Sequence, residues 1–189
     1  MTTNTFNQRV GAAKNFGTTS GSANWTFNNL TFSDSSASPF TITTQTGGSG
    51  TITINGNLLV SASGDSGVTT LNAGNRTWRL VNTNGSNPFD IDQAGGGLTA
   101  STSTFEFTGN NGAGDVTIEN ATYNNLTVGG GSAENYTPEG STTITGNLLV
   151  NTNGTLNGTQ NITLNGHANG AGTINLSGGI FLNKIATAQ

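Results

Sequence analysis

The stretch Ile-Asn-Gly-Asn-Leu-Leu-Val at residues 54–60 returns as Ile-Thr-Gly-Asn-Leu-Leu-Val at residues 144–150, ninety residues further along the 189-residue chain. Each copy follows a second repeated motif, Phe-Asn-Asn-Leu-Thr at 27–31 and Tyr-Asn-Asn-Leu-Thr at 123–127, with an offset of 96 residues. Both motifs join apolar residues to Asn or Gly, which accept the backbone conformations of sharp turns. Motifs that recur in the same order indicate an internally repeated architecture.

A third match sets the expected domain organisation. Thr5-Phe6 corresponds to Thr104-Phe105, at an offset of 99 residues. An offset that drifts from 99 to 90 along the chain is typical of a duplicated unit that has lost loop residues in its second copy. We therefore expect one elongated domain, 1–189, with two repeat units at about 5–98 and 99–189.

Apolar and hydroxylated residues alternate outside these motifs, as in Phe40-Thr41-Ile42-Thr43. A period of two places them on opposite faces of a strand, and the branched Cβ of threonine favours strands. No segment shows a helical apolar stripe, so we expect almost no helix. The expected strands, separated by Gly and Asn turns, are 24–32, 40–45, 50–61, 67–72, 76–81, 89–92, 103–108, 115–118, 122–128, 142–150, 162–165, 173–176 and 180–183.

Two all-β architectures suit a duplicated chain of this kind, a parallel β-helix (β-solenoid) and a tandem β-sandwich. A sandwich closes a thick core within each unit of about 95 residues. A solenoid needs only a narrow core, because hydrogen bonds between stacked turns satisfy its backbone. Hydrophobic residues make up only 31% of the chain, and abundant Asn and Thr suit ladders of like side chains. The composition therefore favours the solenoid.

The composition also excludes several classes of protein. The chain has 34 Thr, 29 Gly, 28 Asn and 16 Ser, but only five Lys and Arg together against nine Asp and Glu. So few cations could not neutralise a run of phosphates, which argues against nucleic-acid binding. No apolar run approaches the ~18 residues of a membrane span. Cysteine is absent, which excludes disulfides and thiol chemistry.

The repeated motifs, Tyr/Phe-Asn-Asn-Leu-Thr followed by Gly-Asn-Leu-Leu-Val, resemble repeats of very long bacterial surface proteins. Those are Gly/Asn/Thr-rich adhesins of the filamentous-haemagglutinin-like and autotransporter-passenger-like kinds. The resemblance covers roughly residues 5–180 and is one of composition and rhythm more than of a diagnostic motif. It implies a secreted parallel β-helix that serves as a stalk, adhesin or matrix fibre, located extracellularly or on the cell surface.

Few residues could carry chemistry. Asp90 and Asp92 would share one strand face, as the paired carboxylates of a polysaccharide-degrading enzyme could do. With Asp115, which lies in a Gly-rich turn, they are also weak candidates for a structural calcium site, since that ion takes six or more oxygen ligands. His167 is the only histidine and lies in a Gly/Asn turn, where we expect it to be exposed. We expect no catalytic residue and no cofactor.

Binding surfaces are the remaining candidates. Trp25, Trp78 and Tyr136 could stack on cell-surface glycans if their rings are exposed, although core packing is the commoner role of tryptophan. Exposed strand edges at the two ends of a solenoid invite association. The apolar residues expected at such a subunit joint are Phe6, Val10, Ile180, Phe181, Leu182 and Ile185.

Taken together, these observations predict a non-enzymatic extracellular structural protein. We expect a fibre or stalk segment that forms a homo-oligomer or filament. A glycan- or cell-binding adhesin module is the first alternative, and a β-helix enzyme that uses Asp90 and Asp92 is the second. A terminal strand that merely closes the core is the competing account of the apolar residues at 180–185.

Overall fold

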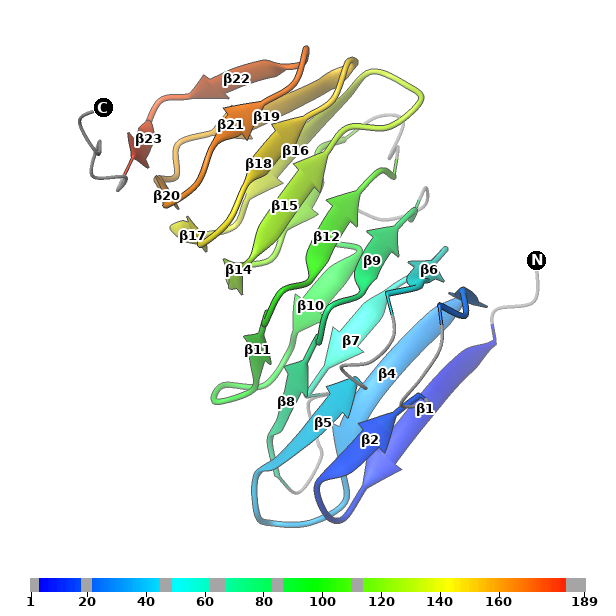
Figure 1. Ribbon diagram of the computed structural model, residues 1–189. Coiled ribbons are helices and arrows are strands. Elements are labelled where there is room, and N and C mark those ends of the chain that lie inside the picture. The colour runs from blue at the N-terminus through cyan, green and yellow to red at the C-terminus, as the bar shows by residue number, and fades with distance from the viewer. Residues whose placement is uncertain are drawn as a thin grey trace, which may run out of the picture.

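The computed structural model describes residues 4–17, 22–44, 49–61, 67–82, 87–109 and 114–182, and this part of the chain contains strands and turns but no helix. All strand pairs are parallel. The chain winds upward turn by turn, with the two termini at opposite ends of the molecule (Figure 1). The prediction of an all-β parallel solenoid is therefore confirmed, and the tandem β-sandwich is wrong.

Consecutive strands belong to different sheets, so each turn of the coil contributes one strand to each of three faces. We name the sheets A to E. Sheet A holds β1 (Thr5–Val10), β4 (Asn29–Asp34), β7 (Leu58–Val60) and β10 (Phe89–Ile91), and sheet B holds β2 (Lys14–Phe16), β5 (Phe40–Thr44), β8 (Thr69–Asn72) and β11 (Gly97–Thr99). Sheet C holds β3 (Trp25–Phe27), β6 (Thr51–Ile54), β9 (Thr77–Leu80), β12 (Thr104–Phe107), β15 (Asn125–Val128), β18 (Leu148–Val150) and β21 (Ala168–Asn169). Sheet D holds β13 (Val116–Ile118), β16 (Glu134–Pro138), β19 (Gly154–Gly158) and β22 (Thr173–Leu176), and sheet E holds β14 (Thr122–Tyr123), β17 (Thr142–Ile144), β20 (Ile162–Leu164) and β23 (Ile180–Leu182).

Sheets A and B end at β10 and β11, and sheets D and E take over at β13 and β14, so that only the seven-stranded sheet C runs from β3 to β21. The length of a turn changes at the same point. Register partners lie 24 to 31 residues apart up to Phe105, as in Phe6 with Leu30 and Leu58 with Phe89. Beyond Phe105 they lie 18 to 22 residues apart.

The core is a continuous apolar column inside the coil. Inward-facing residues stack in register along sheet C, for example Ile52, Trp78, Phe105 and Leu126, all of which are fully buried. The rings of Trp78 and Phe105 are parallel to within 10°, with their centroids 6.0 Å apart. Aromatic burial of this kind supplies much of the apolar area that a narrow coil can remove from water.

The repeated motifs form corners of the coil. Asn29 Oδ1 accepts a hydrogen bond of 2.9 Å from the backbone N–H of Asn57, one turn later. The second copy does the same, with Asn125 Oδ1 accepting from the N–H of Asn147 at 2.9 Å. The chain turns from one face to the next at each of these asparagines, so the side chain ties one corner to the corner of the following turn.

The glycine of the motif is required by this arrangement. A Cβ on Gly56 would lie 2.0 Å from Asn29 Oδ1, and one on Gly146 would lie 2.5 Å from Asn125 Oδ1. The asparagine side chain therefore occupies the space that any other residue would need. This contact explains why the Asn-Asn-Leu and Gly-Asn-Leu motifs recur together.

Four expected strands were too long because each contains a corner. The spans 24–32, 50–61, 122–128 and 142–150 break at Asn28, at 55–57, at Asn124 and at 145–147. In every case the nearest apolar residues on the two sides of the corner face inward, as Ile54 and Leu58 do. The sequence did not separate these inward-facing residues into two strands, which concealed the corners.

The internal repeat maps strand to strand. Thr5-Phe6 begins β1 and Thr104-Phe105 begins β12, while the Asn-Asn-Leu motifs open β4 and β15 and the Gly-Asn-Leu motifs open β7 and β18. Each match is therefore displaced by eleven strands. Because eleven is not a multiple of three, the second copy of each motif lies on a different face, sheet C instead of sheet A.

We expect Gly146→Ala to lower the free energy of unfolding by about 1–3 kcal/mol, since the added methyl group must displace a side chain that is hydrogen-bonded to the next turn. Gly131→Ala is the matched control, because a Cβ there has nothing within 4 Å, and its effect should stay within about 0.5 kcal/mol. Urea denaturation followed by circular dichroism measures both. Equal effects of the two substitutions would contradict the corner argument.

Candidate functional site

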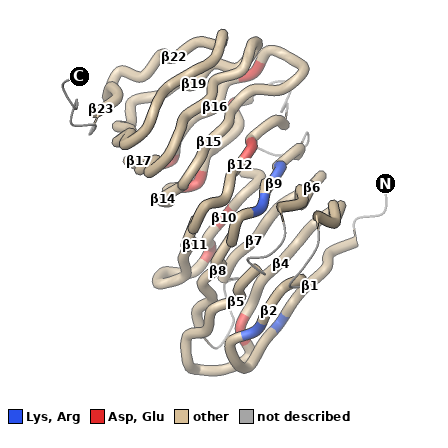
Figure 2. Tube along the Cα trace, in the orientation of Figure 1, with Lys and Arg blue, Asp and Glu red and all other residues tan. Residues whose placement is uncertain are grey.

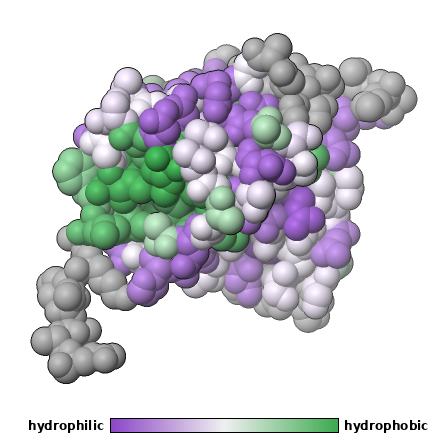
Figure 3. Space-filling view, turned by 90° about the horizontal axis from the view of Figure 1, so that it is seen from above, coloured by the Kyte–Doolittle hydropathy of each residue, from purple (hydrophilic) through white to green (hydrophobic). Residues whose placement is uncertain are grey.

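The C-terminal end of the described coil leaves core positions open. Ile174 pairs with the buried Leu156, and Leu182 pairs with the buried Leu164. Their own side chains are 42% and 68% exposed, because no described strand lies above them. Seen from the end where β22 lies, the surface shows a hydrophobic area edged by hydrophilic atoms (Figure 3).

The N-terminal end presents aromatic side chains. Phe6 pairs with the buried Leu30 and is therefore a core position, yet it is 49% exposed. Its ring centroid lies 5.5 Å from that of Phe27 and 6.3 Å from that of Phe16. β1 also forms the outer edge of sheet A among the described strands. Both ends thus combine an open strand edge with apolar side chains.

The residues expected at a subunit joint are placed in four different ways. Phe6, Leu182 and the partly buried Ile180 occupy core-facing positions at the two ends. Val10 is already buried within the first turn, and Phe181 faces outward beside Thr163. Ile185 lies outside the described residues.

The three candidate glycan-stacking rings are placed mainly in the core. Trp78 and Tyr136 are fully buried, and their polar atoms donate hydrogen bonds to the carbonyls of Ala73 (3.1 Å) and Gly109 (2.9 Å). Trp25 is half-buried and meets the ring of Phe16 edge-on. The fully buried rings of Trp78 and Tyr136 offer no face to a sugar, and the sequence did not distinguish them from surface aromatics.

The three candidate calcium ligands are not gathered into one cluster. Asp115 accepts hydrogen bonds from Thr137 Oγ1 at 2.6 Å and from Asn135 Nδ2 at 3.2 Å, both on the next turn. Asp90 and Asp92 line a groove of about 360 Å³ on sheet A whose other lining residues are Thr, Asn and Leu. Within the described residues, no three His, Cys, Asp or Glu side chains are grouped to hold a metal ion.

Glu119 is the acidic residue that sequence reasoning missed. It lies between β13 and β14, is buried, and its Oε2 accepts a hydrogen bond of 3.3 Å from the backbone N–H of Ile91. β10 of sheet A and β13 of sheet D are not joined by backbone hydrogen bonds. The carboxylate therefore connects two parts of the coil that strand pairing leaves separate. Burial raises the pKa of Glu119 to about 7, a value that includes the lowering effect of the hydrogen bond from Ile91 and the raising effect of the charges of Glu139 and Asp90.

Arg76 and Arg79 are three residues apart in the sequence, but the first points into the coil and the second points out of it. Arg79 points outward, and its Nε donates to Glu106 Oε2 at 2.7 Å. Arg76 is fully buried, with its guanidinium 5.0 Å from the ring centroid of Trp25 and with Nη1 donating to the carbonyl of Ala23 at 3.3 Å. Within the described part of the chain, its Nε and Nη2 have no hydrogen-bond partner.

The backbone of His167 is held in the same way as the backbones of Asn57 and Asn147. Its backbone N–H donates to Asn147 Oδ1 at 3.1 Å, and its side chain is exposed. Charged residues are scattered thinly along the described coil (Figure 2).

Comparison with known proteins adds no assignment. No protein-family model, curated protein or solved structure matches the chain. In the part of the chain that the structure describes, no helix is long and apolar enough to cross a membrane.

We expect the stability of the protein to fall as the pH rises from below 4.5 to above 7. The folded pKa of Glu119 lies near 7, above its ordinary value of 4.5, so the folded state retains a proton that the unfolded state releases. Glu119→Gln should flatten this dependence and raise the melting temperature above pH 7, because the amide oxygen still accepts from Ile91.

Melting temperatures measured across this pH range test the prediction. A small residual slope is expected from Asp90, whose pKa is also raised by burial and by Asp92. An unchanged pH profile in Glu119→Gln would contradict the assignment to this carboxyl.

We expect Arg76→Met to leave the free energy of unfolding unchanged or to raise it by about 1–3 kcal/mol, because the substitution removes a buried charge with unsatisfied donors. Arg79→Met, on the exposed pair, should change it by about 1 kcal/mol or less. A loss of more than about 2 kcal/mol in Arg76→Met would show that the buried guanidinium stabilises the fold.

Proposed function

We propose that this chain is a non-enzymatic structural protein, a rigid segment of an extracellular or cell-surface stalk or fibre that associates end to end. The confirmed β-solenoid supports the proposal, since a hydrogen-bonded coil gives stiffness from a narrow core. The resemblance of the corner motifs to filamentous-haemagglutinin-like and autotransporter-passenger-like surface proteins points the same way.

One observation carries the proposal. Leu182 and Ile174 occupy core positions in the last described turn, yet they are exposed, and Phe6 does the same in the first turn. Covering a leucine or isoleucine side chain is worth about 1.5–3 kcal/mol. End-to-end stacking would cover the C-terminal end of one copy and the N-terminal end of the next.

The direction of the strands determines how such copies join. All described strand pairs are parallel, so the exposed edges of β22 and β23 match the opposite edge of a first turn, where β1 and β2 lie. The two surfaces are different, which makes the contact heterologous. A heterologous contact that does not close into a ring produces an open filament.

Two end variants test the proposal. Phe6→Lys and Leu182→Lys each place a charge at one end, and both positions are exposed enough to tolerate it in a single chain. We expect the unmodified chain to grow in mass with concentration, and each variant alone to stay monomeric. An equimolar mixture should stop at dimers, because each variant keeps one intact end.

Light scattering across a concentration series, with electron microscopy of the same samples, measures the outcome. Thr99→Lys, on the exposed outer face of β11, is the control and should assemble like the unmodified chain. A monomeric unmodified chain, or assembly of Leu182→Lys alone, would overturn the proposal.

A further inference from the structure

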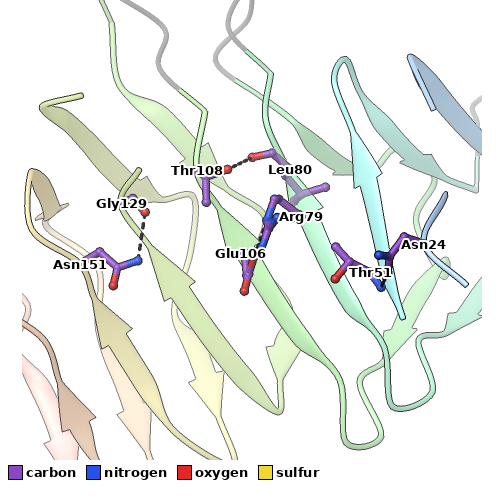
Figure 4. A network of polar contacts seen from close by, with 8 residues as sticks. All are labelled: Asn24, Thr51, Arg79, Leu80, Glu106, Thr108, Gly129 and Asn151. Carbon is purple, nitrogen blue, oxygen red and sulfur yellow. Dashed lines mark hydrogen bonds and ion pairs between the residues drawn. The ribbon is translucent and has the colours of Figure 1, made fainter. Parts of the chain in front are cut away.

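The outer face of sheet C carries a groove of about 610 Å³ that the structural role does not use. Arg79, Glu106, Thr127 and Leu149 follow one another in register across β9, β12, β15 and β18. Four adjacent strands span about 14 Å, which suits a short extended ligand. Figure 4 shows the centre of this region, with Arg79 against Glu106 and Asn151 beside Gly129.

The groove is hollow because glycines form one of its corners. Gly129 and Gly130 follow β15, while Thr108 follows β12 and Asn151 follows β18. A Cβ on Gly130 would lie 2.4 Å from the carbonyl oxygen of Thr108, so no larger residue fits without a shift of the backbone. The two glycines therefore leave this corner of the groove without side chains.

Several polar atoms in the groove are left for a ligand. Asn151 uses Nδ2 to donate to the carbonyl of Gly129 at 3.2 Å, and its Oδ1 makes no hydrogen bond within the described residues. Arg79 uses only Nε and Glu106 only Oε2 in their ion pair. The open groups thus include guanidinium donors as well as carboxylate and amide acceptors.

The balance of these groups selects the chemistry of the ligand. Arg79 and Glu106 carry opposite charges side by side. The carboxylate would therefore repel an anionic ligand, and the guanidinium would repel a cationic one. Leu149 is 36% exposed and adds one apolar contact. A neutral, polyhydroxylated chain supplies donors, acceptors and aliphatic C–H groups together.

We propose that this groove binds a neutral oligosaccharide, with Arg79, Glu106 and Asn151 holding its hydroxyl groups and Leu149 contacting a sugar ring. The site lies on the flank of the coil, away from the two ends, so it is independent of end-to-end association. It also differs from the tryptophan and tyrosine positions that the sequence suggested for glycan contact.

The probes are maltohexaose, xylohexaose and N-acetylchitohexaose, each titrated into the ¹⁵N-labelled chain while amide shifts are recorded by NMR. We expect at least one of them to shift the amides of Gly129, Gly130 and Asn151 with a Kd in the millimolar range. The double variant Arg79→Ala/Glu106→Ala should weaken that binding about tenfold or more.

Thr53→Ala is the matched control. Thr53 occupies the same outward row as Thr127 but lies one strand beyond Arg79, outside the groove. Thr127→Ala should weaken binding and Thr53→Ala should not. A sulfated heparin hexasaccharide, added in parallel, should give no shift at the groove.

Three results would overturn the proposal: no amide shift with any of the neutral hexasaccharides, shifts confined to another face, or equal binding by the double variant. Binding of the sulfated probe alone would also overturn it, since it would assign the surface to anions. Loss of end-to-end association in the variants described above leaves this test unaffected, because a monomer carries the complete groove.

Discussion

The hydrogen bond from a backbone N–H to the asparagine side chain one turn below is the interaction on which the coil depends. Parallel strands pair along the faces, but at each corner the backbone leaves the ladder and its donors need another partner. Asn29 and Asn125 supply that partner to Asn57 and Asn147, and the glycine before each donor residue makes room for the asparagine amide. The position of every face relative to the next follows from where these corners occur.

Much of this architecture could be predicted from local sequence. Alternation of Thr with Ile, Leu and Phe identified the strands, and the low apolar content favoured a narrow core. The corners were harder, because inward-facing apolar residues lie close on both sides of the short polar interruptions at 28–29 and 124–125. Glu119 and Arg76 could not be found at all. Their contacts, Ile91 and Ala23, lie 28 and 53 residues away in the chain, and only the stacking of turns brings them together.

The proposed end-to-end association and the groove involve different parts of the coil, its two ends and its flank. At the ends, core positions such as Phe6 and Leu182 are exposed because stacking stops there. On the flank, side chains such as Arg79 and Glu106 face solvent because alternation places every second residue outside. The exposed core positions concern how copies of the chain associate, and the outward-facing side chains concern which ligand the coil binds.

The displacement of the repeat by eleven strands has a geometric consequence for growth by duplication. Each turn contains three strands, so eleven strands make three full turns and two faces of a fourth. A copied unit therefore starts on another face of the coil. A surface feature carried by successive units would therefore trace a screw around the axis and return to its first face after three units. In a lineage of such coils, lengthening the rod would distribute any ligand-binding feature around its whole circumference.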